Sequence, residues 1–138
     1  MNILFFLKPK NDIIFVHDDS LMTEVLEIIK NYRHSAIPVL DEEGKYVGTI
    51  TEGDVLDFFI NYSRQHYEKS FLTPLRRVPR RRDYACVRVN ADIEDLILKA
   101  TTQNFVPVID DSNSFIGIVT RGDIISYMYN KAKRENNF

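Results

Sequence analysis

The sequence is poor in the residues that build disulfide and metal frameworks. Its 138 residues include one cysteine, Cys86, which excludes an internal disulfide and any CxxC metal site and is typical of the reducing cytoplasm. We expect Cys86 to lie in a buried strand. The three histidines, His17, His34 and His66, lack the spacing of metal ligands. The sequence therefore predicts a cytoplasmic protein without a metal site.

Long apolar runs and a strong charge of either sign are also missing. The opening MNILFFL reaches only six residues beyond the Met before Lys8, and it has neither a basic region nor a small-residue cleavage site. We expect residues 3–6 to pack on the domain, with a dimer contact as the alternative. A net charge of −2 argues against general attraction to nucleic acids or membranes.

Catalytic motifs are absent as well. The chain contains no G-x-S-x-G, no P-loop and no recognisable triad. Asp54 and Asp123 could be imagined as a carboxylate pair, but no nucleophile stands near either of them in the sequence. We therefore expect a protein that is not an enzyme.

The chain does contain one sequence pattern that occurs twice. An offset of 69 residues, as from Thr51 to Thr120, aligns GTITEGDV at 48–55 with GIVTRGDI at 117–124. The identities pair Pro38, Val39, Asp41, Gly48, Thr51, Gly53 and Asp54 with Pro107, Val108, Asp110, Gly117, Thr120, Gly122 and Asp123. Internal repetition of this kind predicts two copies of one structural unit.

Hydrophobic periodicity predicts the order strand, helix, strand, strand, helix in each copy. In the first copy the strands are expected at residues 13–16, 36–40 and 46–50. The first helix is expected to begin at residue 21, after an N-cap at 18–20, and the second at residue 53. The last of these helices would bury Val55, Leu56, Phe58, Phe59 and Ile60. In the second copy they are expected at 85–89, 92–102, 106–109, 115–119 and 122–131, with the first helix about one turn shorter.

Each copy, near 65 residues, is too small to bury a comfortable core alone. We therefore expect an α/β (α+β) fold in which the two copies pack about a pseudo-twofold axis. The expected boundaries are an N-terminal segment and first repeat at 1–68, an arginine-rich linker at 69–83, and the second repeat with a tail at 84–138.

Two motifs now carry a resemblance to a known family. The hydrophobic-Pro-Val strands at 37–39 and 106–108 and the glycine-hydrophobic-x-Thr-x-x-Asp signatures at 48–54 and 117–123 resemble those of a tandem pair of CBS domains, or Bateman module, of the stand-alone type. The resemblance implies a regulatory protein that binds an adenosine ligand, such as AMP, ADP, ATP, cyclic di-AMP or S-adenosylmethionine, in a cleft between the repeats. It also implies a homodimer that signals to a client protein.

The resemblance implies the roles of the site residues. The family's Thr and Asp hold the ribose hydroxyls, and groups near the hydrophobic-Pro-Val strand flank the base. In the expected first cleft, Arg121 offers a phosphate five donors, whereas Glu52 in the second would repel it. We therefore expect a phosphorylated ligand in the first cleft and expect the second to be empty or to hold a nucleoside, with the alternative that Arg121 and Glu52 are merely solvated. The first cleft would use Ile14, Ser35, Ala36, Ile37, Pro38, Thr120, Arg121 and Asp123, and the second Thr51, Asp54, Asn104, Phe105, Val106 and Pro107.

Structural alternatives remain for each motif. T-x-x-D at a helix start also fits a capping box, in which case the chain would be a ligand-free dimerisation or adaptor module. Gly53 and Gly122 fit either ligand approach or a tight turn. The five arginines of LRRVPRRRD at 75–83 fit a solvated loop, a phosphate-binding rim with His34, Arg76 and Arg77, or, least well, a nucleic-acid site.

Overall fold

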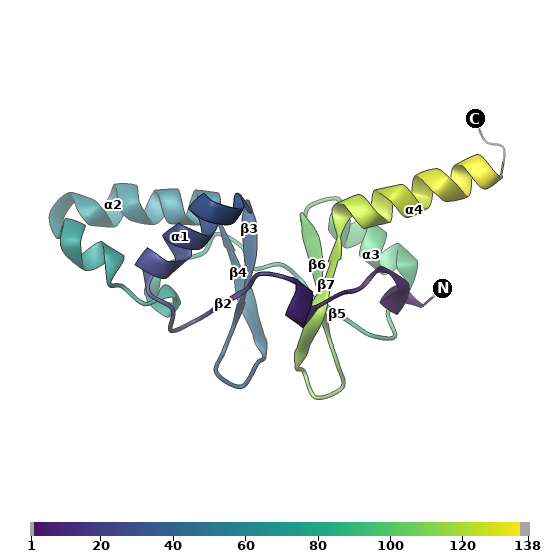
Figure 1. Cartoon of the computed structure of the whole chain (residues 1–138), viewed down its shortest axis with the longest axis horizontal. Helices are drawn as coiled ribbons and strands as arrows, with labels where there is room; N and C mark the ends of the chain where they lie inside the picture. Colours follow the sequence, from purple (N-terminus) through teal and green to yellow (C-terminus); the bar gives the residue numbers. More distant parts are fainter. Residues whose placement is uncertain (1, 136–138) are drawn as a thin grey trace. The chain divides into compact units, whose positions relative to one another are not determined.

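The polypeptide divides into two units, each built around one copy of the repeat. The computed structural model describes residues 2–135, without the side chains of residues 63–65. Residues 14–83 form the first-repeat unit, and residues 2–13 join residues 84–135 in the second-repeat unit. Each unit places helices against a sheet (Figure 1), which confirms the mixed α/β class.

The first-repeat unit contains a sheet of order β2-β3-β4. Strands β2 and β3 are parallel, and β3 and β4 form an antiparallel hairpin. The elements are β2 (Val16–His17), α1 (Met22–Tyr32), β3 (Ala36–Leu40), β4 (Tyr46–Thr51), α2 (Glu52–Phe71) and the 3-10 helix η3 (Leu75–Arg77). Helix α2 extends into the expected linker, so that residues 69–71 are helical.

The second-repeat unit contains a sheet of order β1-β7-β6-β5. Strands β5 and β6 are parallel, and β6 and β7 form the matching hairpin. The elements are η1 (Ile3–Phe6), β1 (Lys8–Pro9), η2 (Lys10–Asp12), β5 (Val87–Arg88), α3 (Ile93–Ala100), β6 (Phe105–Ile109), β7 (Phe115–Thr120) and α4 (Arg121–Arg134). Helix α3 has 8 residues and α1 has 11, which confirms the shorter first helix.

Each hairpin has an aspartate whose side chain accepts backbone hydrogen bonds in its turn. The carboxylate of Asp41 accepts hydrogen bonds from the backbone N–H groups of Glu43 and Lys45, each at 2.9 Å. The carboxylate of Asp110 does the same for residues 112 and 114. The left-handed position before the second strand is held by Gly44 in one turn and Asn113 in the other, the two residue types that tolerate it best.

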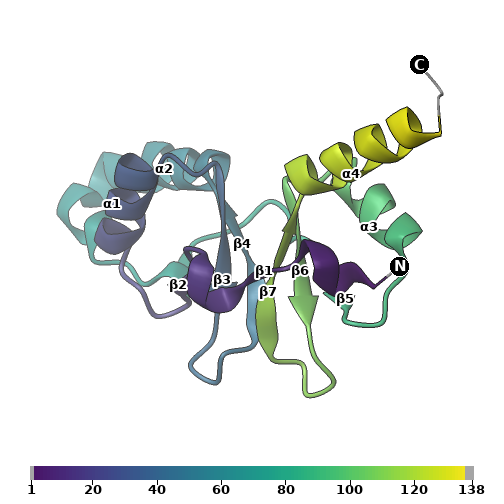
Figure 2. The same cartoon turned by 45° about the vertical axis from the view of Figure 1, so that its right-hand side comes forward.

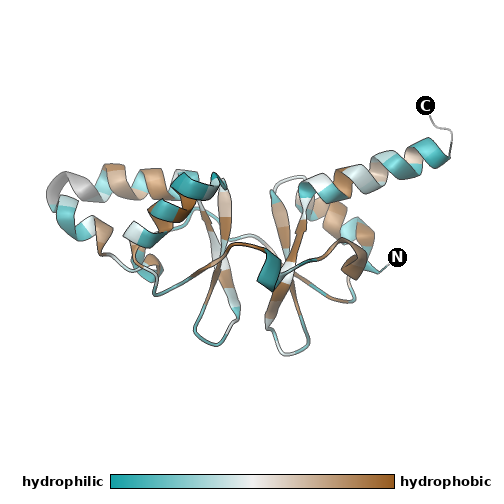
Figure 3. Ribbon diagram, viewed as in Figure 1, coloured by the Kyte–Doolittle hydropathy of each residue, from teal (hydrophilic) through white to brown (hydrophobic). Residues whose placement is uncertain are grey.

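Apolar side chains from the strands and helices fill one core in each unit. Figure 3 shows the apolar stretches of the strands in brown. In α2, Val55 and Phe58 are buried as expected, and Phe59 is half-buried. Leu56 and Ile60 were expected to be buried, but they are exposed on the opposite side of the helix. A 20-residue helix with apolar residues at successive positions cannot turn all of them toward one sheet.

Two local expectations are wrong. The N-cap of α1 is Leu21 rather than one of residues 18–20, and no side chain caps it. Instead the Met22 N–H donates to the carbonyl oxygen of Thr73 at 2.9 Å, while the Ser20 hydroxyl accepts from the N–H of His17. A distant part of the chain thus replaces the local cap. Cys86 is half-buried and precedes β5 rather than lying in it.

The segments outside the repeats pack in a way that differs from the expected boundaries. The N-terminal segment was grouped with the first repeat, but β1 pairs with β7 (Figure 2). Ile3, at 1% exposure, enters the core of the second-repeat unit. Residues 72–83 belong to the first-repeat unit, and Leu75 and Val78 are buried in its core. Pairing with β7 and burial in the first core, rather than sequence adjacency, determine these groupings.

Candidate functional site

The two T-x-x-D motifs lie where the second strand of each hairpin runs into the following helix. Thr51 is the N-cap of α2 and Thr120 the N-cap of α4. Each threonine Oγ1 accepts a hydrogen bond from the aspartate backbone N–H three residues later, at 3.1 Å in the first repeat and 3.2 Å in the second. The capping alternative therefore holds for both threonines. The aspartate side chains, however, differ.

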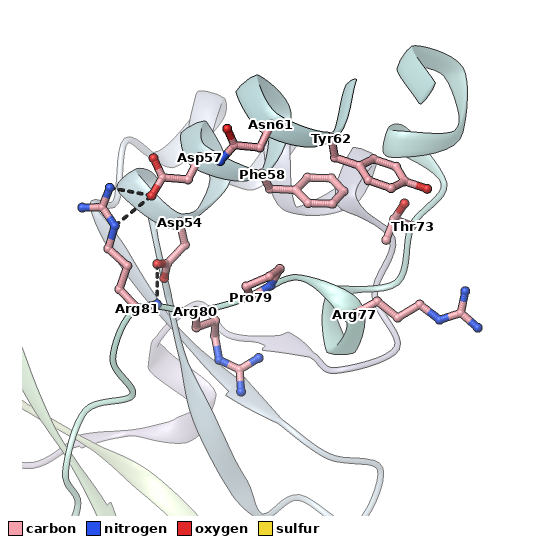
Figure 4. A pocket seen from close by; sticks show the side chains of 10 residues that line it. All are labelled: Asp54, Asp57, Phe58, Asn61, Tyr62, Thr73, Arg77, Pro79, Arg80 and Arg81. Carbon is pink, nitrogen blue, oxygen red and sulfur yellow. Dashed lines mark hydrogen bonds and ion pairs between the residues drawn. The ribbon is translucent and has the colours of Figure 1, made fainter. Parts of the chain in front are cut away.

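The carboxylate of Asp54 is shielded from solvent and hydrogen-bonded. The residue is 2% exposed, and its Oδ2 accepts the N–H of Thr51 at 3.0 Å, which completes the capping box. Its Oδ1 accepts the backbone N–H of Arg81, in the linker, at 2.9 Å (Figure 4). Both oxygens are engaged, and the 2% exposure of the residue leaves little of the carboxylate accessible to a ligand hydroxyl.

The carboxylate of Asp123 is open to solvent. Its side chain is 43% exposed and lies 4.0 Å from the Lys8 ammonium, in an ion pair that solvent weakens. Among the described residues, no backbone N–H donates to it, so the return bond of the capping box is missing. Asp123 opens into a groove of about 520 Å³ that is lined also by Phe6, Lys8, Tyr127 and Arg134. A carboxylate with unused lone pairs can accept hydrogen bonds from a ligand.

Arg121 has a structural contact that the sequence did not suggest. Its Nε donates to the carbonyl oxygens of Ala100 at 2.8 Å and Gln103 at 3.1 Å, at the end of α3. This contact satisfies carbonyls that the helix leaves without partners. It leaves the terminal guanidinium nitrogens for other contacts, so the expected phosphate role stays a prediction.

The residues near the hydrophobic-Pro-Val strands mostly belong to the cores. Ile37, Pro38, Val106 and Pro107 are buried in β3 and β6, so any contact that they make with a ligand would come from the backbone. Ile14 packs at the edge of the first core.

Ser35 and Ala36 lie beside the T-x-x-D corner of their own repeat. The Glu52 N–H donates to the carbonyl oxygen of Ser35 at 3.0 Å, and Ala36 pairs with Thr51 in the ladder. In the second repeat, Arg121 N–H donates to Asn104 and Phe105 pairs with Thr120. The expected combination of residues 14 and 34–38 with residues 120–123 joins residues of different units and stays a prediction.

The expected phosphate contacts occupy different settings. His34 is exposed after the end of α1. Arg76 lines a hollow with Asp18, Asp19, Asp41, Glu42 and Glu43, where five carboxylates oppose the approach of a phosphate. Arg77 lines a different groove, beside α2, whose lining includes the two carboxylates of Asp54 and Asp57 (Figure 4).

The other linker arginines are held by acidic side chains. Arg81 Nε donates to Asp57 at 2.8 Å, and Arg80 Nε donates to Asp83 at 2.7 Å. The hydrogen bond with Asp83 raises the pKa of Arg80, although burial opposes the rise. Asp83 in turn accepts the N–H of Thr49 at 3.0 Å. The contacts of Arg81 with Asp57 and of Asp83 with Thr49 fasten the linker to the rest of the first-repeat unit, and sequence reasoning missed these two because they join residues 24 and 34 positions apart.

The glycines of the motif separate into two kinds. A Cβ on Gly48 would lie 2.2 Å from Asp83 Oδ1, and one on Gly117 would lie 2.2 Å from the Lys8 carbonyl oxygen. These glycines therefore permit the close approach of the linker and of β1. Gly122 has nothing within 4 Å of such a Cβ, and a Cβ on Gly53 would meet only ordinary contacts at 3.7 and 3.8 Å. Neither has a positive φ, so no left-handed backbone requires glycine there, and both ligand approach and a tight turn stay as predictions.

Within the described residues, no group of His, Cys, Asp and Glu side chains is arranged to hold a metal ion. The helices of residues 2–135 include none that is both long and apolar enough to cross a bilayer.

Comparisons with known proteins agree with the repeat. The family model described as CBS domain matches residues 7–61 and 75–130. An inosine-5'-monophosphate dehydrogenase of Methanocaldococcus jannaschii is 29% identical over 116 residues, which are 83% of this chain and 21% of the dehydrogenase. The chain thus spans about a fifth of that relative.

Two solved structures have similar folds. The crystal structure of CbpB in complex with c-di-AMP has a TM-score of 0.83 and 23% identity, and the match covers 99% of this chain and 90% of CbpB. The structure of CBSX2 in complex with AMP has a TM-score of 0.75 and 22% identity, and that match covers 94% of this chain and 96% of CBSX2.

Proposed function

Since the chain belongs to the CBS domain family, we propose that it is a regulatory module that binds an adenosine nucleotide at its T-x-x-D corners and signals to a partner protein. The ligand class is AMP, ADP, ATP or cyclic di-AMP. The names of two structurally similar proteins, which were crystallised with c-di-AMP and with AMP, support this class.

The observation that carries the proposal is the open carboxylate of Asp123. Two vicinal ribose hydroxyls need an acceptor with free lone pairs, and charged acceptors make the stronger hydrogen bonds. Asp123 offers such an acceptor at a helix N-terminus, where polar and anionic ligands are also favoured. We therefore assign the main nucleotide contact to Thr120 and Asp123, with the secondary one at Thr51 and Asp54.

Regulation rather than catalysis is the role that fits this proposal. The dehydrogenase relative is matched over only a fifth of its length, so its reaction is not carried over to this chain. A bound nucleotide would instead favour one conformation of the module over another. The resulting population shift can be no larger than the difference in affinity between the two conformations.

A thermal-shift panel of AMP, ADP, ATP, cyclic di-AMP and S-adenosylmethionine tests the proposal. A nucleotide present at a hundredfold excess over its dissociation constant should stabilise the protein by about 2.7 kcal/mol. The Asp123→Ala variant should lose this stabilisation. Asp54→Ala should retain more of it, relative to its own unliganded melting temperature. Equal losses in the two variants would refute the assignment of Asp123 as the main contact.

An adaptor that binds no ligand is the second candidate, and the closed capping box of Asp54 favours it. The absence of a shift with every member of the panel would support this candidate. Nucleic-acid binding through the linker has less support, because Asp57 and Asp83 already engage Arg81 and Arg80.

A further inference from the structure

The first helices of the two repeats end in different ways. Helix α1 is followed by Arg33 in the left-handed conformation, and the Arg33 N–H donates to the carbonyl oxygen of Ile29 at 2.9 Å. The shorter helix α3 is followed by Thr101, which keeps a right-handed helical conformation. The last carbonyls of a helix need donors from outside it. For Ala100 this donor is the Arg121 Nε at 2.8 Å, so a side chain of α4 satisfies the end of α3.

Arg121 holds the turn between α3 and β6 at three carbonyl oxygens. Its Nε–H is shared between Ala100 at 2.8 Å and Gln103 at 3.1 Å, an arrangement that is common at helix ends. Its backbone N–H donates to the carbonyl oxygen of Asn104 at 3.0 Å. The matching residue of the first repeat is Glu52, whose ionised carboxylate can only accept hydrogen bonds. The side-chain contact is therefore specific to the second repeat.

Gln103 gives Arg121 a fixed acceptor. The residue is 3% exposed. Its side-chain amide accepts the N–H of Ala85 at 2.9 Å and donates to the carbonyl oxygens of Ala85 at 3.0 Å and Phe105 at 3.1 Å. Its backbone N–H donates to Lys99 at 3.0 Å. A buried polar network in which both ends of an amide are bonded is rigid, so the Gln103 carbonyl that Arg121 contacts is held in place.

Asp123 depends on such a support more than Asp54 does. The Asp54 carboxylate accepts two backbone N–H groups, which fix it directly. Asp123 has the cap bond from its own N–H to Thr120 Oγ1 at 3.2 Å and an exposed ion pair with Lys8. Arg121 lies between Thr120 and Asp123 in the first turn of α4. The contacts of Arg121 therefore fix the backbone from which the Asp123 carboxylate projects.

We propose that Arg121 is a positioning residue for the T-x-x-D corner of the second repeat. It holds the first turn of α4 against the turn between α3 and β6, so that Thr120 and Asp123 keep the geometry in which they meet two ribose hydroxyls. Its effect falls on the nucleoside part of the ligand rather than on a phosphate. This role rests on the proposed nucleotide function.

Titration calorimetry with adenosine and with AMP tests the proposal on the parent protein and on Arg121→Gln. We expect Arg121→Gln to weaken both ligands by the same factor, about fivefold, because the lost hydrogen bond acts through the backbone of the corner. A direct contact with phosphate would instead weaken AMP by about tenfold or more and leave adenosine unchanged. Each titration is done well below the melting temperature of the variant, so that lost binding is not lost folding.

Arg88→Gln is the matched control. Arg88 lies in the same unit, and its guanidinium also donates to a backbone carbonyl, that of Asp110 in the hairpin turn, at 3.1 Å. We expect Arg88→Gln to bind adenosine and AMP like the parent. The proposal is overturned if Arg121→Gln weakens only AMP, if it weakens neither ligand, or if Arg88→Gln weakens both ligands equally.

Amide hydrogen exchange without ligand gives a second readout, which does not depend on nucleotide binding. Arg121→Gln should speed the exchange of the Asp123 N–H by about fivefold, because the first turn of α4 opens more often, and Arg88→Gln should not. If neither ligand binds the parent, the proposed nucleotide function fails. Faster exchange in Arg121→Gln alone would then still support the positioning of Asp123 by Arg121, and unchanged exchange would overturn it.

Discussion

Asp54 and Asp123 occupy the same position of the repeat but make different contacts. Asp54 is buried and accepts two backbone N–H groups, one of them from the linker, whereas Asp123 is open to solvent beside Lys8. The sequence predicted both residues as ligand groups and also offered capping as the alternative. Capping could be foreseen from the local spacing, but the contact with Arg81 could not, because it joins residues 27 positions apart.

The two aspartates should therefore differ in their contribution to stability. Asp54→Ala leaves the buried N–H groups of Thr51 and Arg81 without acceptors, so we expect the free energy of unfolding to fall by about 1–3 kcal/mol. Asp123→Ala removes only an exposed ion pair and should cost about 0.5 kcal/mol or less. Urea unfolding of the two variants measures the difference, and equal costs would contradict the contacts described here.

Ile3 and Phe5 provide a second contrast between neighbouring residues. Ile3 is 1% exposed in the core of the second-repeat unit, while Phe5 is 83% exposed. Ile3→Ala should lower the free energy of unfolding by about 2–4 kcal/mol, and Phe5→Ala should leave it almost unchanged. If both variants unfold like the parent protein in urea, the N-terminal segment does not pack as described.

At the scale of the elements, local pattern was a good guide. Both hairpins were predicted within a residue or two, because alternation, an aspartate and a left-handed turn residue all lie within one short stretch. The start of α1 was wrong because its first N–H is satisfied by Thr73, a contact that no local pattern encodes. Leu56 and Ile60 were misassigned because α2 has apolar residues on two faces, and the sequence pattern does not show which face is buried.

The pairing of β1 with β7 depends on a glycine. Gly117 has a φ of +156°, and a Cβ there would meet the backbone of Lys8. We expect Gly117→Ala to lower the free energy of unfolding by about 2–3 kcal/mol and the melting temperature by about 5–15 °C. Gly122→Ala is the control, because its Cβ would meet open space, and calorimetric scans should show it to be as stable as the parent. Equal melting temperatures for the two variants would contradict the close approach of β1.

At the scale of the whole molecule, the expected homodimer is still a prediction from the family resemblance. Apolar side chains are exposed at matching positions of two helices, Leu56 and Ile60 on α2 and Ile125 and Tyr129 on α4. We propose that a second copy covers them, since burying such side chains is favourable. Replacing Leu56 and Ile125 by Glu should convert a dimer into a monomer in sedimentation velocity, whereas Leu98→Glu, at an exposed position of α3, should not. A parent protein that sediments as a monomer would contradict the prediction.

The central claim is that the open carboxylate of Asp123 holds the sugar of an adenosine nucleotide. Titration calorimetry of AMP and cyclic di-AMP into the parent protein, Asp123→Ala and Asp111→Ala tests it most directly, because Asp111 is an exposed carboxylate in the hairpin turn. We predict saturable binding of at least one nucleotide to the parent and to Asp111→Ala, and none to Asp123→Ala. Undiminished binding by Asp123→Ala, or no binding by the parent, would contradict the claim.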